Sequence, residues 1–170
     1  MEAQPRNISW RGTPVELSGT EVKVGDKAPD CELVANDLSP VKLSSYQGKI
    51  RIISAVPSLD TPTCDMETRK FNQMAANMNP DTVILTVSMD LPFAQKRWCG
   101  AAGVDKVITL SDHLKGEFGQ SYGVLIAARR LLARAVFLVD RAGVVRHVEV
   151  VGEVAREPDY NAILKKLAEL

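Results

Sequence analysis

A predicted strand followed at once by a helix that begins with a cysteine constrains the fold more than any other feature of this sequence. An apolar run over Arg51–Val56 predicts a buried strand, and Pro57 ends it because proline lacks an amide hydrogen for a sheet. A helix is predicted directly afterwards, with Thr61 as N-cap and Pro62 as its first residue. Cys64 then falls at the third helical position.

The start of a helix can stabilise a thiolate because its first amide groups have no acceptor within the helix. A thiol with the ordinary pKa of about 8.5 needs about 3.4 kcal/mol of stabilisation to become mostly ionised at neutral pH. A helix end typically supplies only about 0.3–1 kcal/mol. If Cys64 is reactive, the fold must therefore bring a cation and further donors to its sulfur. The alternative is a buried cysteine without a chemical role.

Strands and helices alternate along the rest of the chain and end in a hairpin and a helix. Apolar runs predict strands at Cys31–Ala35, Val41–Leu43, Thr82–Met89, Val107–Leu110, Arg134–Val139 and Val144–Val150. Helical spacing predicts helices at Pro62–Met78, Pro92–Ala102, Leu114–Tyr122 and Pro158–Leu170. This order predicts the α/β class, with a mixed central sheet flanked by helices. We expect one domain over residues 1–170, with residues 1–18 as an N-terminal β-hairpin extension.

The composition argues against several classes of protein. The 21 acidic and 21 basic side chains are mixed along the chain, and no basic stripe indicates nucleic-acid binding. No apolar run approaches the roughly 18 residues of a spanning helix, so membrane insertion is not expected. Three cysteines are too few for a disulfide scaffold, and a cytoplasmic location favours a redox or catalytic role for them. His113 and His147 are not spaced as metal ligands, and no cofactor is expected.

Three sequence blocks resemble the thiol peroxidase subfamily of the peroxiredoxins. The first block is the Pro-x-x-x-Thr-x-x-Cys pattern of Pro57, Thr61 and Cys64, followed by Arg69–Asn72. The second block is the run Asp90–Gly100, and the third is the run Leu132–Val136. Together the blocks span most of the chain in the order of that family. The resemblance implies a thioredoxin-like fold and an enzyme that reduces hydrogen peroxide and organic hydroperoxides, including alkyl and lipid hydroperoxides.

The resemblance gives the first block and Arg134 their expected roles. Cys64 would be the peroxidatic nucleophile that a peroxide oxidises to a sulfenic acid. Arg134, in an otherwise apolar segment, would be the missing cation, although it could instead extend from an edge into solvent. Thr61 either caps the helix only or also orients the peroxide, and Pro57 would shield the pocket from water. Backbone amides at the helix start would complete the contacts.

The second block contains Cys99, the candidate resolving cysteine. It lies 99 − 64 = 35 positions after Cys64, and its alternative role is that of a core cysteine beside Trp98. The resemblance implies an intramolecular Cys64–Cys99 disulfide, thioredoxin as the reductant and a homodimer. Because both cysteines are predicted in helices, the disulfide would require one helix to unwind locally. Cys31 matches no catalytic position of the family and is expected to be structural.

Two other functions use the same features. A thioredoxin-like disulfide oxidoreductase would share the fold but normally needs two cysteines close in sequence, which this chain lacks. A peroxide sensor or redox relay would use the same thiolate and pass its oxidation to a partner protein. Catalytic turnover of peroxide separates an enzyme from a sensor.

Overall fold

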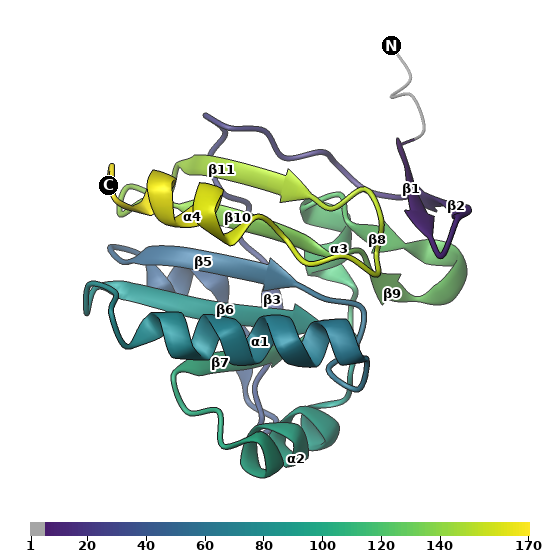
Figure 1. The fold of residues 1–170 in the computed structure, drawn as a ribbon, viewed down its shortest axis with the longest axis horizontal. Coiled ribbons are helices and arrows are strands. Elements are labelled where there is room, and N and C mark those ends of the chain that lie inside the picture. Colours follow the sequence, from purple (N-terminus) through teal and green to yellow (C-terminus); the bar gives the residue numbers. More distant parts are fainter. Residues whose placement is uncertain (1–5) are drawn as a thin grey trace.

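A seven-stranded mixed sheet forms the centre of the structure, a computed structural model that describes residues 6–170 (Figure 1). The strand order is β11-β10-β5-β6-β7-β3-β4. The parallel strands at its centre are β5 (Ile50–Ala55), β6 (Thr82–Ser88) and β7 (Val107–Ser111). The strands that join them antiparallel are β10 (Ala135–Val139), β11 (Val145–Val150), β3 (Glu32–Val34) and β4 (Pro40–Lys42).

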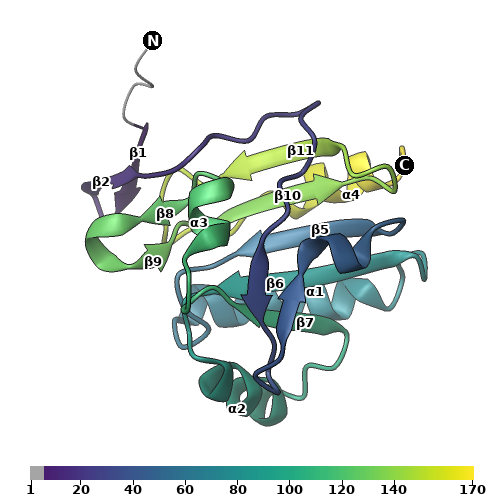
Figure 2. The same cartoon turned by 180° about the vertical axis from the view of Figure 1, so that it is seen from behind.

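Helices cover the sheet on both faces. Helices α1 (Pro62–Ala75) and α4 (Tyr160–Leu167) lie side by side over one face, and α2 (Pro92–Ala102) packs beside β7 (Figure 1). Helix α3 (Glu117–Ser121) and the 3-10 turn η1 (Leu43–Tyr46) lie on the other face (Figure 2). Every residue of β5 is therefore buried, with Ile52 and Ile53 in separate hydrophobic clusters. No helix within residues 6–170 is long and apolar enough to cross a membrane.

Two small hairpins lie at the end of the sheet where β5 stops and α1 begins (Figure 1). They are formed by β1 (Arg6–Trp10) with β2 (Thr13–Leu17), and by β8 (Leu125–Ile126) with β9 (Leu131–Leu132), which the 3-10 turn η2 (Ala127–Arg129) connects. The Ser9 amide donates to the Gly152 carbonyl, and the Ser18 amide to the Leu125 carbonyl, both at 2.7 Å. The first bond holds the N-terminal hairpin against the loop after β11, and the second holds its end against β8.

The predicted fold class and N-terminal hairpin are confirmed, and the differences concern the ends of several elements and one short strand pair. Helix α1 ends at Ala75 instead of Met78 because the next three residues bond to carbonyls three positions back. Arg134 lies one residue before β10 and not within the strand. The β8–β9 pair was not predicted, since two-residue strands have no periodicity. Residues 1–5 of the expected 1–18 extension lie outside the described residues.

Candidate active site

Cys64 occupies the third position of α1, as the sequence predicted. Thr61 is the N-cap, and its hydroxyl oxygen accepts a hydrogen bond from the Cys64 amide at 3.4 Å. The same hydroxyl donates to the Ser58 carbonyl at 3.0 Å, so it is fixed from both sides. The Cys64 side chain is fully buried. A thiolate here would lie at the positive end of the helix dipole.

Arg134 supplies the cation that the helix start alone could not provide. Its Nη2 donates to Cys64 Sγ at 3.3 Å, and its Nε donates to the Val154 carbonyl at 2.9 Å. Its own carbonyl accepts from the Val151 amide at 3.0 Å, which fixes the backbone as well. Only 1% of the residue is exposed, so the alternative of a side chain extending into solvent is wrong. A dry environment strengthens the attraction between guanidinium and thiolate.

Glu67 is the partner of this buried arginine and was not predicted from the sequence. Its carboxylate accepts hydrogen bonds from Arg134 Nη1 and, at 2.8 Å, from Ser54 Oγ, and it is fully buried. Burial raises the pKa of Glu67, while the Arg134 guanidinium opposes that rise. Burial likewise works against the charge of Arg134, but Glu67 and Cys64 raise its pKa above the usual value. The sequence signal was an acid three positions after Cys64, one helical turn away on the same face.

Asp90 fixes the loop between β5 and α1. Its carboxylate accepts from Ser58 Oγ at 2.7 Å, from the Leu59 amide at 2.8 Å and from Ser88 Oγ at 2.7 Å. The loop before the helix is thereby tied to the end of β6. The Thr61 cap and Cys64 consequently rest on a rigid connection, as a precisely positioned nucleophile requires.

A small cavity of about 80 Å³ opens over the start of α1. Pro57, Thr61 and Arg134 line its inner side, and Trp10 and Arg11 of the N-terminal hairpin contribute to its rim. Pro57 is buried and presents an apolar ring to the space. The volume suits the reactive end of a small molecule, while the remainder of a larger molecule would extend past the hairpin.

The hairpin is fastened beside this cavity by Glu153. The Glu153 carboxylate accepts from the Arg11 amide at 2.9 Å and from the Ala155 amide at 3.2 Å. These bonds, of which the one from the Arg11 amide has the largest effect, lower the pKa of Glu153 to about 2. A carboxyl whose pKa is lowered by folding stabilises the fold above its unfolded pKa of about 4.3, and this contribution disappears as the pH falls to the folded value.

The contribution of Glu153 to the attachment of the hairpin is therefore expected to be complete above about pH 4.3 and to decrease progressively toward pH 2, where the carboxylate itself becomes protonated in the folded protein. Nuclear magnetic resonance shifts of the Arg11 and Ala155 amides would follow it. Glu153→Gln should remove this transition and accelerate deuterium exchange of both amides at neutral pH. A transition near pH 4 would contradict the argument, because it would show an unperturbed carboxyl.

Cys99 lies in the last turn of α2 and is half-buried. All three cysteines are free thiols. Helix α2 is tied to α1 beside it, because Trp98 Nε1 donates to the Asp65 carboxylate at 2.9 Å and Arg69 Nη1 to the Ala102 carbonyl at 3.2 Å. Cys64 lies within a hydrophobic cluster on one face of the sheet, and Cys99 packs against the same cluster. The two thiols are separate in this structure.

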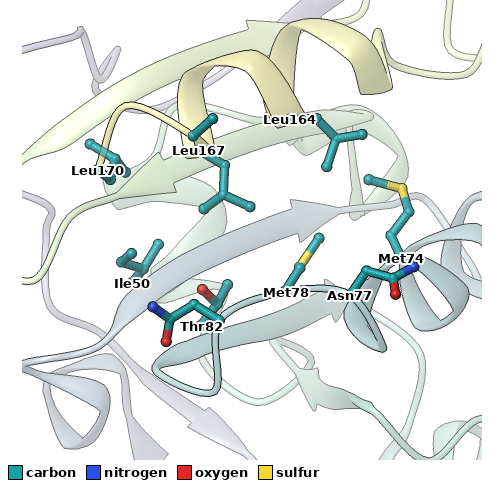
Figure 3. A pocket seen from close by; sticks show the side chains of 10 residues that line it. Ile50, Met74, Asn77, Met78, Thr82, Leu164, Leu167 and Leu170 are labelled. Carbon is teal, nitrogen blue, oxygen red and sulfur yellow. The ribbon is translucent and has the colours of Figure 1, made fainter.

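A second hollow, of about 420 Å³, lies between the far end of α1 and helix α4 (Figure 3). Its lining is mainly apolar and includes Ile50, Met74, Met78, Leu164, Leu167 and Leu170. None of the predicted site residues reaches it, because Met74 lies three turns along α1 from Cys64. Within residues 6–170, no group of three or more histidine, cysteine or acidic side chains is placed to hold a metal ion.

Comparisons with known proteins show which family this chain is similar to. The redoxin family model matches residues 23–164. A thiol peroxidase of Oceanobacillus iheyensis is 55% identical over 161 residues, which cover 95% of this chain and 98% of that protein. The thiol peroxidase of Bacillus subtilis is 51% identical, with 90% and 91% covered. A crystal structure of a peroxiredoxin-like protein from Aquifex aeolicus superposes with a TM-score of 0.90 at 42% identity, and 96% of each chain is covered.

Proposed function

Because this chain belongs to the thiol peroxidases of the redoxin family and is a thiol-dependent peroxidase, we propose that Cys64 is its peroxidatic cysteine. The observation that supports this assignment most strongly is the buried Cys64 sulfur at a helix N-terminus with Arg134 Nη2 at 3.3 Å. The helix N-terminus and the guanidinium both favour the negative charge of a thiolate at this position. The substrates in this proposal are hydrogen peroxide and organic hydroperoxides.

In the first step, the Cys64 thiolate attacks the terminal oxygen of the hydroperoxide. A sulfur–oxygen bond forms, the oxygen–oxygen bond breaks, and the departing oxygen takes up a proton and leaves as water or an alcohol. Sulfur is oxidised by two electrons to a sulfenic acid, and the peroxide is reduced. Arg134 stabilises first the thiolate and then the charge that develops on the departing oxygen. Thr61 orients the peroxide, and Pro57 keeps bulk water from the sulfur.

In the second step, Cys99 resolves the sulfenic acid. Its sulfur attacks the Cys64 sulfur, the disulfide forms, and the sulfenic oxygen leaves as water. The Cα atoms of a disulfide must lie within about 7 Å, so one helix has to open. The arrangement favours opening of α2, because Cys99 lies in its last turn and helix ends fray. Helix α1, in contrast, is capped by Thr61.

We further propose that thioredoxin reduces the disulfide through its own dithiol, that the protein acts in the cytoplasm, and that its working form is a homodimer. The test of the whole cycle is peroxide consumption coupled to thioredoxin and thioredoxin reductase. Steady turnover supports the proposal, whereas one stoichiometric oxidation without turnover would favour a sensor. The molecular mass in solution tests the dimer separately.

Cys99→Ser is expected to leave the first oxidation of Cys64 intact and to stop thioredoxin-driven cycling. The sulfenic acid would form as before, since Cys99 takes no part in that step, but it could not be converted into the intramolecular disulfide. Non-reducing mass mapping of the peroxide-treated unmodified protein should show the Cys64 and Cys99 peptides joined within one chain. A predominant link between two chains would refute the intramolecular assignment.

A further inference from the structure

The side chain of Cys99 is hydrogen-bonded to a threonine that is itself oriented by an asparagine. Cys99 Sγ lies 3.5 Å from the Thr109 hydroxyl oxygen, and this hydroxyl donates to Asn36 Oδ1 at 3.0 Å. A threonine hydroxyl has a single proton, and Asn36 accepts it. The proton in the contact between Cys99 and Thr109 must therefore come from the thiol. The bonds run in one direction, from Cys99 to Thr109 to Asn36.

The two acceptors in this series of hydrogen bonds, Thr109 and Asn36, belong to parts of the fold that do not move with α2. Thr109 is 3% exposed and lies within β7. Asn36 lies in the turn between β3 and β4. Two backbone hydrogen bonds of 2.9 Å close this turn: the Ala35 amide donates to the Ser39 carbonyl, and the Leu38 amide donates to the Ala35 carbonyl. When α2 opens, Cys99 must consequently leave an acceptor that remains fixed to the sheet.

We propose that Thr109, oriented by Asn36, is a positioning residue that restrains Cys99 and sets the rate at which it reaches the oxidised Cys64. This inference rests on the proposed function, because it concerns the resolving step. Before the disulfide can form, the bond from the thiol to Thr109 must break and the last turn of α2 must unwind. The thiol then loses its proton, the sulfur–sulfur bond forms, and water leaves.

The restraint has a chemical consequence for Cys64. While the sulfenic acid waits for Cys99, a second peroxide molecule can transfer an oxygen to it, giving a sulfinic acid and water or an alcohol. A slower release of Cys99 therefore increases the fraction of enzyme lost to this reaction. The contact can break, since a thiol is a weak donor and Cys99 faces an open groove of about 410 Å³ where water can replace the hydroxyl.

The chain offers a matched pair of substitutions, Thr109→Val and Thr86→Val. Thr86 lies directly opposite Thr109 in the ladder between β6 and β7 and is 1% exposed. Its hydroxyl has no hydrogen-bond partner within residues 6–170. Both substitutions replace a hydroxyl by a methyl group in a buried strand. Only Thr109→Val removes a contact to Cys99, so a general effect on the sheet would appear in both variants.

Thr109→Val is expected to speed formation of the Cys64–Cys99 disulfide by about threefold to tenfold, the loss of one weak hydrogen bond. Single-turnover mixing with peroxide, acid quenching and mass mapping would measure this rate. The first oxidation should keep its rate, and the sulfinic fraction under excess peroxide should fall. Thr86→Val should change none of these quantities, and Thr109→Ser, which retains the hydroxyl, should keep the wild-type disulfide rate.

A second measurement tests the restraint on Cys99 without depending on disulfide formation. In a Cys64→Ser background, alkylation of Cys99, followed on its own peptide, should be faster with Thr109→Val than with Thr86→Val. Equal alkylation and equal disulfide rates in the two variants would overturn the proposal. A wild-type protein that forms no Cys64–Cys99 disulfide would instead refute the resolving role of Cys99, and the alkylation rates would still decide whether Thr109 restrains it.

Discussion

Cys64→Ser is expected to abolish catalytic peroxide consumption. A serine hydroxyl at this position keeps the size and the hydrogen-bonding capacity of the side chain, but it is hardly ionised at neutral pH and cannot be oxidised as sulfur is. Arg134 retains Glu67 and the Val154 carbonyl as partners, so the fold should persist. The assay coupled to thioredoxin and its reductase measures the loss, and thermal unfolding shows that the variant is folded.

Cys31→Ser provides the matched control because it removes another buried thiol. Cys31 is 3% exposed, and burial together with the nearby Asp112 carboxylate raises the pKa of its thiol well above the usual value. Such a thiol stays protonated and unreactive at neutral pH. The control variant should therefore consume peroxide at the wild-type rate. Sustained turnover by Cys64→Ser would refute the assignment of the nucleophile, and loss of turnover in Cys31→Ser would show that catalysis needs more than Cys64 and Cys99.

Arg134→Met is expected to have the second largest effect, and the effect has two separable parts. The first oxidation should slow by about 10²–10³-fold, the usual consequence of removing one preorganised donor from a developing charge. The thiolate absorbance of Cys64 at neutral pH should decrease at the same time. The variant should also lose about 3–5 kcal/mol of stability, because Glu67 remains as a buried carboxylate without its cation.

The pH dependence and a double variant separate these two parts. Without Arg134, burial alone raises the pKa of Glu67. A carboxyl whose pKa is raised by folding favours the folded state at low pH and loses that contribution as the pH rises, so Arg134→Met should become more stable in acid. Adding Glu67→Gln removes the buried charge and should restore much of the stability at neutral pH without restoring the rate. An unchanged thiolate signal in Arg134→Met would contradict the role given to Arg134.

Much of this fold could be predicted from the sequence because its signals are local. Apolar runs of strand length, helical spacing and the hairpin at residues 140–143 follow from the preferences of neighbouring residues. The helix start at Thr61 and Pro62 was predicted for the same reason, because an N-cap bonds to amides within three residues of itself. The short β8–β9 pair was not predictable, since its two-residue strands are held by contacts with the rest of the fold.

The candidate site likewise combines features that were predicted from the sequence with contacts that only the fold creates. The sequence by itself determined that Cys64 stands at the start of a helix after a buried strand, and that one helix end stabilises a thiolate too little. It could name Arg134 as a candidate cation, but these residues are 70 positions apart, and only the packing of β10 against β5 brings the guanidinium to the sulfur. Glu67 was missed because an acid on a helix is ordinarily at the surface.

The tertiary structure also decided what surrounds Cys99. Its neighbours Thr109 and Asn36 come from β7 and from the turn after β3, so no local pattern of α2 could have indicated them. The physical reason is the same in both parts of the site. Helix starts and turns are determined by bonds between residues close in sequence, whereas the environment of each sulfur is formed by side chains that only the sheet order brings together.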